Sequence, residues 1–236
     1  MQTMKIAGFQ KVTLIDYPNK IACLIFLYGC NFRCGFCHNP ELVIEENKTS
    51  FSENEILDYL EKRKNYLDGI CITGGEPLIS IDKDFLKKIK KRGYSIKIDT
   101  NGSFPEKLKE LINENLVDFV SMDIKSSKEK YALLCDAEVD LNKIEESIKI
   151  IASLPEYEFR TTIIEDVQDA EEMKKIAEWL NEVIGRIPKR FVLQGFKKSG
   201  KYIDNEFTKA KDTSEEYLKN IQEQIKNYFA EIEIRV

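Results

Sequence analysis

Histidine is nearly absent from this chain, and long apolar runs are absent altogether. His38 is the one histidine among 236 residues, which excludes a metal site built from several imidazoles. No apolar stretch approaches the roughly 18 residues that a membrane-spanning helix needs. The segment from Met1 to Lys5 also lacks the apolar core of a secretory signal. We therefore expect a soluble, cytoplasmic protein that does not bind membranes.

A surplus of basic charge is likewise missing. The 36 basic and 41 acidic residues give a formal net charge of −5, which argues against non-specific binding to nucleic acid. Hydrophobic residues make up 42% of the chain, enough for a sizeable core. A length of 236 residues suits one large α/β domain, so we expect a single domain over residues 1–236.

The chain does contain a dense group of cysteines. Cys30, Cys34 and Cys37 form a CxxxCxxC run in one predicted loop. Three thiolates in one loop can hold three irons of a [4Fe–4S] cluster and leave the fourth iron open for another ligand. A cluster with an open iron can bind a substrate, whereas a cluster held by four cysteines carries electrons only.

Two alternative roles of these cysteines stay open. A structural zinc ion needs four ligands, commonly from two separated arms, and this chain has one arm. His38 directly follows Cys37, and neighbouring residues rarely bind one small ion together. Disulfides are expected mainly in small secreted proteins that lack a large core. Cys23, Cys71 and Cys135 are interpreted as plain buried thiols.

Strand-like and helix-like segments alternate along the chain. Apolar runs predict strands at 20–28, 69–73, 94–99, 116–124, 158–164, 191–196 and 232–236. Amphipathic patterns predict helices at 52–66, 82–92, 105–115, 142–153, 169–184 and 213–229. These strand–helix units imply an α/β fold with a parallel sheet, but they are too few for a closed barrel of eight units. Residues 4–17 are expected to form a hairpin or a cap over one end.

The unusual residues of the sequence fall at one end of the predicted strands. In parallel α/β folds, the loops after the carboxyl ends of the strands carry the chemistry. We therefore expect one site there, formed by Cys30, Cys34, Cys37, Gly74, Gly75, Glu76, Asp99, Thr100, Asn101, Asp123, Lys125, Arg160 and Gln194.

Several of these residues are also compatible with a purely structural role. Gly74-Gly75 and Asn101-Gly102 are common turn sequences. Asp123 and Lys125 could be a solvent-facing pair. Arg160 alternates with apolar residues on a strand, where its charge needs a carboxylate partner, and that partner could be an ion-pair residue or a ligand.

The CxxxCxxC run resembles the hallmark of the radical S-adenosylmethionine (SAM) superfamily, and Gly74-Gly75-Glu76-Pro77 resembles its GGEP motif. The resemblance implies a [4Fe–4S] cluster on the three cysteines, with SAM bound to the fourth iron. Backbone carbonyls of the GGEP turn and Glu76 would face the SAM amino group, and Arg160 would face its carboxylate.

The same resemblance implies a fold. It is the superfamily's partial (β/α)6 barrel, which is open on one side. In this chain residues 1–19 would form an N-terminal cap or hairpin and residues 20–212 the barrel. Residues 213–236 would form a C-terminal helix and a closing strand.

Within the superfamily, Cys37-His38-Asn39-Pro40 resembles the activating enzymes of glycyl radical enzymes. Two further segments resemble matching strand ends of these enzymes: Asp99-Thr100-Asn101-Gly102 and Ser121-Met122-Asp123-Ile124-Lys125. Equivalent positions there contact SAM or bind a nearby monovalent cation. The likeness is greatest to the short activating proteins of anaerobic ribonucleotide reductase, and it includes Leu14-Ile15-Asp16-Tyr17-Pro18 and Leu193-Gln194-Gly195-Phe196.

This resemblance implies a reaction and two partners. One-electron cleavage of SAM would give a 5′-deoxyadenosyl radical, which removes a hydrogen atom from a glycine of a glycyl radical enzyme. Flavodoxin or ferredoxin would donate the electron. The basic run at residues 87–92 is interpreted as a solvated helix face, with docking of an acidic electron donor as the alternative.

The sequence departs from the family pattern at one position. Related formate-lyase activating enzymes carry a histidine near the end of the sixth strand, where this chain has Gln194. This difference weakens an assignment to formate-lyase activation. Two further hypotheses stay open: a radical SAM enzyme for a small molecule, such as 7-carboxy-7-deazaguanine synthase, and a non-catalytic electron-transfer or metal-sensing protein.

Overall fold

The computed structural model describes residues 4–44, 50–165 and 167–236. Their contacts divide the chain into two compact units. The first unit comprises Met1–Asn31, Glu41–Thr100 and Glu106–Val120, and the second comprises Phe32–Pro40, Asn101–Pro105 and Ser121–Val236. The expected single domain over residues 1–236, with its cap, barrel and C-terminal parts, stays a prediction.

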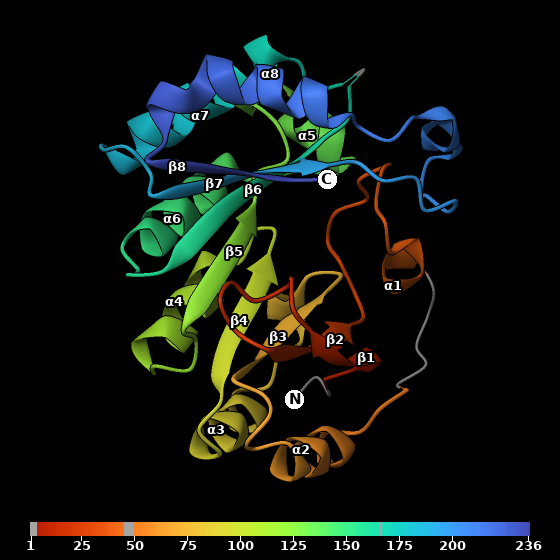
Figure 1. Ribbon diagram of the computed structural model, residues 1–236, viewed down its shortest axis with the longest axis vertical. Helices are drawn as coiled ribbons and strands as arrows, with labels where there is room; N and C mark the ends of the chain where they lie inside the picture. Colours follow the sequence, from red (N-terminus) through yellow and green to blue (C-terminus); the bar gives the residue numbers. More distant parts are fainter. Residues whose placement is uncertain (1–3, 45–49, 166) are drawn as a thin grey trace. The chain divides into compact units, whose positions relative to one another are not determined.

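Strands and helices alternate in chain order (Figure 1). In the first unit, β1 (Ile6–Thr13) pairs antiparallel with β2 (Ala22–Leu27), while β2, β3 (Gly69–Gly74) and β4 (Ser95–Thr100) pair in parallel. In the second unit, β6 (Tyr157–Ile163), β7 (Arg190–Gly195) and β8 (Glu231–Arg235) pair in parallel. The remaining strand, β5 (Phe119–Asp123), crosses the division.

Strand order along the sheet follows the chain from β1 to β8 within the described residues. The order is linear, so the sheet is open in this part of the chain. The α/β class and the predicted strands are therefore confirmed. The segment expected to form a hairpin or a cap contributes β1.

Each predicted helix is also present. The α-helices are α1 (Pro40–Ile44), α2 (Glu53–Lys62), α3 (Lys83–Lys91), α4 (Pro105–Asn113), α5 (Tyr131–Cys135), α6 (Leu141–Ala152), α7 (Ala170–Ile184) and α8 (Glu215–Ile225). Short 3-10 turns are η1 (Pro77–Ile79), η2 (Lys128–Lys130), η3 (Asn205–Lys209) and η4 (Lys226–Tyr228). The sequence did not predict α1 and α5, because a single turn is too short to show a helical period. None of the helices in the described ranges is long and apolar enough to cross a membrane.

Helix α2 shows how local sequence sets a boundary. Ser52 Oγ accepts a hydrogen bond from Glu55 N (3.2 Å), and Ser52 N donates to Glu55 Oε2 (2.7 Å). This capping box satisfies backbone groups that the first turn would otherwise leave unpaired. The helix ends before the predicted residue 66, because Tyr66 N donates to Arg63 O (2.8 Å) in a tight turn.

Each unit has its own buried contacts. In the first, Tyr17 packs against Phe119 and Ala22. In the second, α7 packs against α8, and Trp179 of α7 meets Tyr131 edge-on with ring centroids 5.8 Å apart. The indole Nε1 of Trp179 donates to Glu145 Oε1 (2.9 Å), so the ring is anchored at its polar end.

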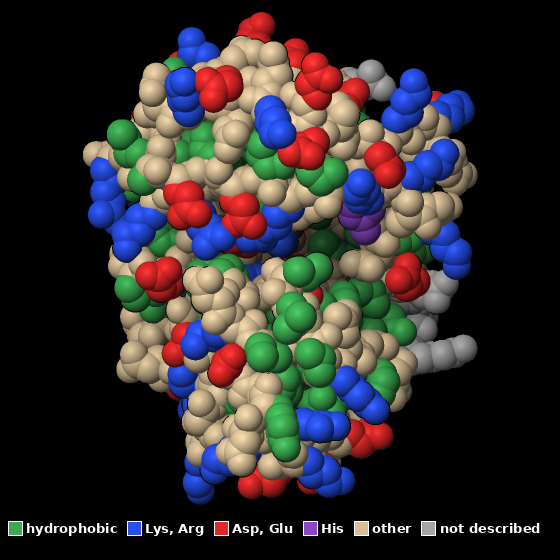
Figure 2. Space-filling view, in the orientation of Figure 1, with side chains coloured by type: hydrophobic (Ala, Val, Ile, Leu, Met, Phe, Trp, Pro, Cys, Tyr) green, Lys and Arg blue, Asp and Glu red, His purple; other side chains and the backbone are tan. Residues whose placement is uncertain are grey.

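The basic run of α3 belongs to the surface of the first unit. Lys87 and Lys88 are exposed, and their Nζ atoms lie 3.3 Å from Glu114 and 3.6 Å from Glu53. These contacts agree with a solvated helix face. Figure 2 also shows apolar side chains gathered on the visible face of this unit, and its exposed apolar residues include Leu14 and Ile15.

Candidate functional site

The cysteine run starts in the loop that follows β2. Gly29 has φ 95°, a conformation that other residues rarely adopt, and its nitrogen donates to Leu42 O (2.9 Å). The next residue, Cys30, is half-buried in the first unit. In the second unit, Cys37 N donates to Cys34 O (3.0 Å), which closes a tight turn. All six cysteines are free thiols, so no disulfide occupies the three that form the run.

Cys34 lies among groups that favour its thiolate form. A hydrogen bond from the Cys135 side chain lowers the pKa of Cys34 to about 7; Lys125 acts in the same direction, while burial and Asp123 oppose it. The backbone reinforces this contact, because Arg33 N donates to Cys135 O (2.8 Å). Thiolates rather than thiols bind iron, so this environment suits a metal ligand. Sequence analysis treated Cys135 as a plain buried thiol, because nothing in its own segment points to Cys34.

Asp123, Lys125 and Arg160 form a charged group in the second unit. Lys125 Nζ lies 2.9 Å from Asp123 Oδ2, and Arg160 Nε lies 2.7 Å from Asp123 Oδ1. Burial alone would raise the pKa of Asp123, but the charges of Arg160 and Lys125 hold it well below its usual range. Asp123 in turn outweighs the effect of burial on Lys125 and raises its pKa. The group therefore carries two positive charges and one negative charge at neutral pH.

The Gly74-Gly75 turn packs directly on the end of β2 in the first unit. A Cβ atom on Gly74 would lie 2.3 Å from Leu27 N, and one on Gly75 would lie 2.1 Å from Gly29 O. Both positions therefore require glycine because of a neighbouring backbone, and the approach of this turn to the SAM amino group stays a prediction. The Gly75 Cβ position is also 3.1 Å from Cys30 N, so the GGEP turn lies beside the first cysteine.

Glu76 is fully buried and hydrogen-bonded within the first unit. Its Oε1 atom accepts hydrogen bonds from Leu78 N (3.0 Å) and from Thr100 Oγ1 (2.9 Å). The side chain thus caps the turn after β3 and connects it to the end of β4. These contacts give Glu76 a structural role, and its predicted approach to the SAM amino group stays a prediction.

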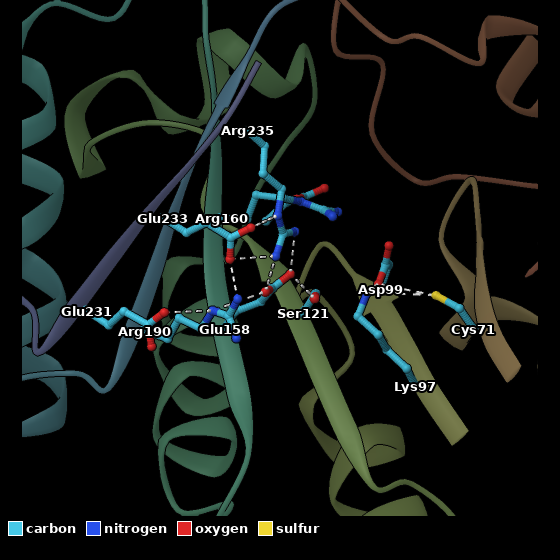
Figure 3. A network of polar contacts seen from close by, with 11 residues as sticks. Cys71, Lys97, Asp99, Ser121, Glu158, Arg160, Arg190, Glu231, Glu233 and Arg235 are labelled. Carbon is cyan, nitrogen blue, oxygen red and sulfur yellow. Dashed lines mark hydrogen bonds and ion pairs between the residues drawn. The ribbon is translucent and has the colours of Figure 1, made fainter. Parts of the chain in front are cut away.

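Asp99 has a cationic partner that sequence analysis missed. Lys97 Nζ forms an ion pair with Asp99 Oδ1 and donates to Cys71 Sγ at 3.8 Å (Figure 3). The Lys97 side chain is 1% exposed and that of Asp99 is 12% exposed. Lys97 and Asp99 alternate with isoleucines on β4, which places both on one face of the strand. A charged residue that alternates with apolar residues on a strand was the sequence signal for Lys97. The same pattern identified Arg160 as a candidate.

Asn101 and Gly102 form a turn in the second unit. Asn101 Oδ1 accepts hydrogen bonds from Ser103 N (3.0 Å) and Ser103 Oγ (2.6 Å). Gly102 has φ 79°, and its carbonyl accepts a hydrogen bond from Ser147 Oγ (2.6 Å). These contacts favour the simple turn interpretation of this segment.

Glu158 of β6 is a second buried charge that sequence analysis missed. Arg235 donates to its two carboxylate oxygens at 3.0 and 2.8 Å, and Ser121 Oγ donates at 2.6 Å (Figure 3). No short-range pattern predicts this ion pair, because its partners lie on strands far apart in the chain. Gln194 pairs in register with Arg235 on one side and with Thr162 on the other, so it also lies at these strand ends.

Within each unit, predicted site residues do lie together. The first unit brings together Cys30 and Gly75, and Glu76 and Thr100; the second brings together Cys34, Asp123, Lys125 and Arg160. The cysteine run itself is divided, with Cys30 in the first unit and Cys34 and Cys37 in the second. Among the described residues, no three or more His, Cys, Asp or Glu side chains are grouped closely enough to hold a metal ion.

A comparison with protein families identifies the superfamily. Residues 24–183 match the model of the radical SAM superfamily. The chain belongs to this superfamily. The match includes the CxxxCxxC run, the GGEP turn, Asp99, the Asp123 group and Arg160. The chain is therefore a radical SAM enzyme, and its fold is the partial α/β barrel of that superfamily, as predicted.

Relatives of this radical SAM chain include named activating enzymes. A protein of Methanocaldococcus jannaschii that carries the provisional name of a glycyl-radical enzyme activating enzyme is 32% identical over 98% of this chain and 95% of its own length. A pyruvate formate-lyase-activating enzyme of Listeria monocytogenes is 31% identical over 51% of this chain and 53% of its own.

A solved radical SAM structure has a similar fold. The crystal structure of Streptococcus suis SuiB bound to S-adenosylmethionine superposes with a TM-score of 0.66 at 17% identity. The match covers 88% of this chain and 47% of the SuiB chain. At this identity the likeness supports the fold.

Membership of the superfamily implies a [4Fe–4S] cluster and SAM, and the donor groups of this chain fit both. The three cysteines of the run are free thiols, and Cys34 has an environment that favours the thiolate. The two cations beside Asp123 suit the carboxylate of SAM. A monovalent cation fits less well, because Asp99 and Asp123 each already have cationic side chains as partners.

Proposed function

We propose that this chain is an activating enzyme of a glycyl radical enzyme, with an anaerobic ribonucleotide reductase as the partner. When bound, the cluster and SAM supply a 5′-deoxyadenosyl radical, which takes a hydrogen atom from a glycine of the partner. The likeness to the M. jannaschii relative covers nearly the whole of both chains, and it supports this class of partner.

The observation that carries the proposal is the charged group of the second unit next to a cysteine of the run. Lys125 is close enough to Cys34 to lower the pKa of its thiol, and Lys125 and Arg160 share Asp123. A cysteine ligand beside two cationic side chains suits a carboxylate-bearing ligand of the cluster. In this arrangement Arg160 and Lys125 bind the SAM carboxylate, and Asp123 orients both cations.

The titration behaviour of this group also favours radical chemistry. The pKa of Asp123 lies far below neutrality and that of Lys125 far above it. Neither group can exchange a proton readily at neutral pH, so the group holds charge rather than acting as a general acid or base. Removal of a hydrogen atom by a radical needs no such catalyst.

The remaining residues of the proposed site hold its loops. Glu76 and the two glycines fix the turn after β3 against the start of the cysteine loop. Asp99 and Thr100 end β4 and Asn101 follows it, and these residues would contact the SAM nucleoside. Gln194 would contact the nucleoside from β7 with an amide in place of an imidazole. We further propose that a reduced flavodoxin or ferredoxin donates the electron.

Electron paramagnetic resonance tests the proposal directly. The protein is reconstituted anaerobically with iron and sulfide, reduced, and mixed with SAM and a purified anaerobic ribonucleotide reductase. A glycyl radical signal on the partner, with 5′-deoxyadenosine formed in proportion, is the expected result. Cys34→Ala should abolish both, whereas Cys23→Ala, which removes a buried thiol of β2, should preserve both.

The remaining outcomes separate the alternatives. Production of 5′-deoxyadenosine without a radical on any glycyl radical protein would contradict the proposed partner and favour a small-molecule substrate. A cluster that forms without any cleavage of SAM, even with substrate present, would favour the electron-transfer hypothesis. A radical on a formate-lyase-type partner alone would assign the protein to that branch despite Gln194.

A further inference from the structure

Lys97 is a buried lysine with partners of three kinds in the first unit. Its Nζ atom forms an ion pair with Asp99 Oδ1 and donates to Cys71 Sγ at 3.8 Å (Figure 3). The same atom lies 6.0 Å from the ring centroid of Phe119. The side chain is only 1% exposed. A carboxylate, a soft sulfur and an aromatic face are together the surroundings that stabilise an ammonium ion away from water.

The arrangement around Asp99 differs from that of a cation-binding carboxylate. Hard cations such as K⁺ and Na⁺ need several oxygen ligands around them. Here two hydrogen-bond donors, Lys97 Nζ and the Cys71 thiol, converge on Asp99 Oδ1. A metal ion at Asp99 would face the Lys97 ammonium across one carboxylate, and repulsion between like charges is strong in a buried setting.

We propose that the Lys97 ammonium takes the place of a metal ion beside Asp99, so that the enzyme binds SAM without a monovalent cation. Lys97 is thus a positioning residue: it holds the Asp99 carboxylate and supplies the positive charge permanently. This inference rests on the proposed place of Asp99 in the SAM site. In this respect the chain would differ from the activating enzymes that it resembles, for which the resemblance implies a monovalent cation.

The wild-type enzyme gives the first test. The reconstituted protein is exchanged under anaerobic conditions into KCl, NaCl or tetramethylammonium chloride of equal ionic strength. We expect the melting temperature to agree within about 1 °C and the SAM dissociation constant to agree within about twofold in the three salts. A saturable rise of melting temperature or of SAM affinity with K⁺ or Na⁺ would overturn the proposal.

The substitution Lys97→Met provides the converse test. It keeps the length of the side chain but removes the ammonium, and Asp99 then becomes available to an external cation. We expect K⁺ to raise the melting temperature of this variant saturably, by about 3 °C. We expect SAM affinity to fall roughly tenfold in tetramethylammonium and to recover in K⁺.

Two further variants isolate the cause. The double variant Lys97→Met with Asp99→Asn removes both charges and should lose the response to K⁺. Lys83→Met removes a lysine of α3 that bridges Glu110 of α4 and Glu114 just beyond that helix, each at 2.6 Å, and should show no response to K⁺, as in wild type. A response to K⁺ that persists in the double variant would place the cation elsewhere and overturn the proposal.

The readouts do not depend on the partner protein. If Lys97→Met fails to fold, the salt comparison on the wild type still decides. If the wild type yields no glycyl radical on any partner but binds SAM equally in all three salts, the proposed function fails and this inference stands. If a radical forms only in the presence of K⁺, the inference fails and the proposed function stands.

Discussion

Asp99 and Asp123 are carboxylates that each stand at the end of a strand, but their counter-charges differ. Asp99 has one ammonium partner, Lys97, which is 1% exposed. Asp123 has two cationic partners, Lys125 and Arg160, whose side chains are 17% and 19% exposed. The first pair is almost fully buried, whereas the second group contains two cations around one carboxylate and is partly exposed.

The difference assigns the two groups different tasks. A balanced, buried pair has no net charge to offer a ligand, and therefore it serves to fix a loop. A partly exposed group with two cations can bind an anion. We infer that the Asp123 group of the second unit binds the charged part of SAM, and that the Lys97–Asp99 pair fixes the end of β4 within the first unit.

The largest expected difference between the two groups concerns the thiol that lies beside each of them, Cys34 and Cys71. We expect Cys34→Ser to lose bound iron and to reduce SAM cleavage to the background level, because Cys34 is the proposed cluster ligand in the positive group. Cys71→Ser, beside the Lys97–Asp99 pair, should keep its iron content and cleave SAM within about twofold of wild type. Iron analysis and assay of 5′-deoxyadenosine measure both. Equal loss in the two variants would contradict the distinction.

The next prediction compares how much Asp99 and Asp123 each contribute to the free energy of unfolding. Asp99→Asn leaves a fully buried ammonium without its carboxylate and should lower the free energy of unfolding by about 3–5 kcal/mol. Asp123→Asn leaves cations that water can reach, so we expect a smaller loss of about 1–2 kcal/mol. Urea unfolding at pH 7.5 measures both, with the exposed Asp84→Asn as a control that should change little. The reverse order would show that Asp123 is the more enclosed group.

A third prediction concerns binding. Arg160→Met removes one of the two cations beside Asp123, so we expect SAM to bind about tenfold more weakly. Lys174→Met, on the exposed face of α7, should leave the affinity unchanged. Anaerobic equilibrium dialysis with labelled SAM gives both values. Unchanged affinity in Arg160→Met would remove this group from the SAM site.

The smallest expected effect is a pH dependence. The pKa of Asp123 is depressed in the folded state, so its stabilisation is fully present above the ordinary value of about 4. It is lost only as the pH falls further, towards the folded pKa. We therefore expect the difference in unfolding free energy between wild type and Asp123→Asn to stay constant from about pH 8 to pH 5 and to shrink below about pH 4. A difference that already shrinks near neutral pH would contradict the depressed pKa.

The features that the sequence predicts correctly are those that depend on residues close by in the chain. Apolar runs located the strands, and the spacing of Cys34 and Cys37 and the position of Asp123 at a strand end pointed to a site. The helix predicted at 52–66 begins where expected, with Ser52 as the N-cap of α2. These features depend on neighbours a few residues away, which the sequence displays directly.

The missed features depend on pairing between distant segments. Arg235 and Glu158 meet through the register of strands that lie far apart in the chain, and Cys135 reaches Cys34 from a separate helix. The need for glycine at Gly75 comes from the Gly29 carbonyl. Lys97 differs from these cases, because its alternation with Asp99 is visible in the sequence of β4. The sequence does not show that the side chain is buried.

Trp179 makes the second unit optically distinct. It is the one tryptophan of the chain, and it is held between Tyr131 and Glu145, both of which belong to that unit. Its fluorescence therefore senses the surroundings of α7 and reports on the second unit selectively. Circular dichroism, by contrast, averages over all helices and strands. The two signals recorded during one denaturant titration will coincide if the units unfold together and will separate if one unit opens first.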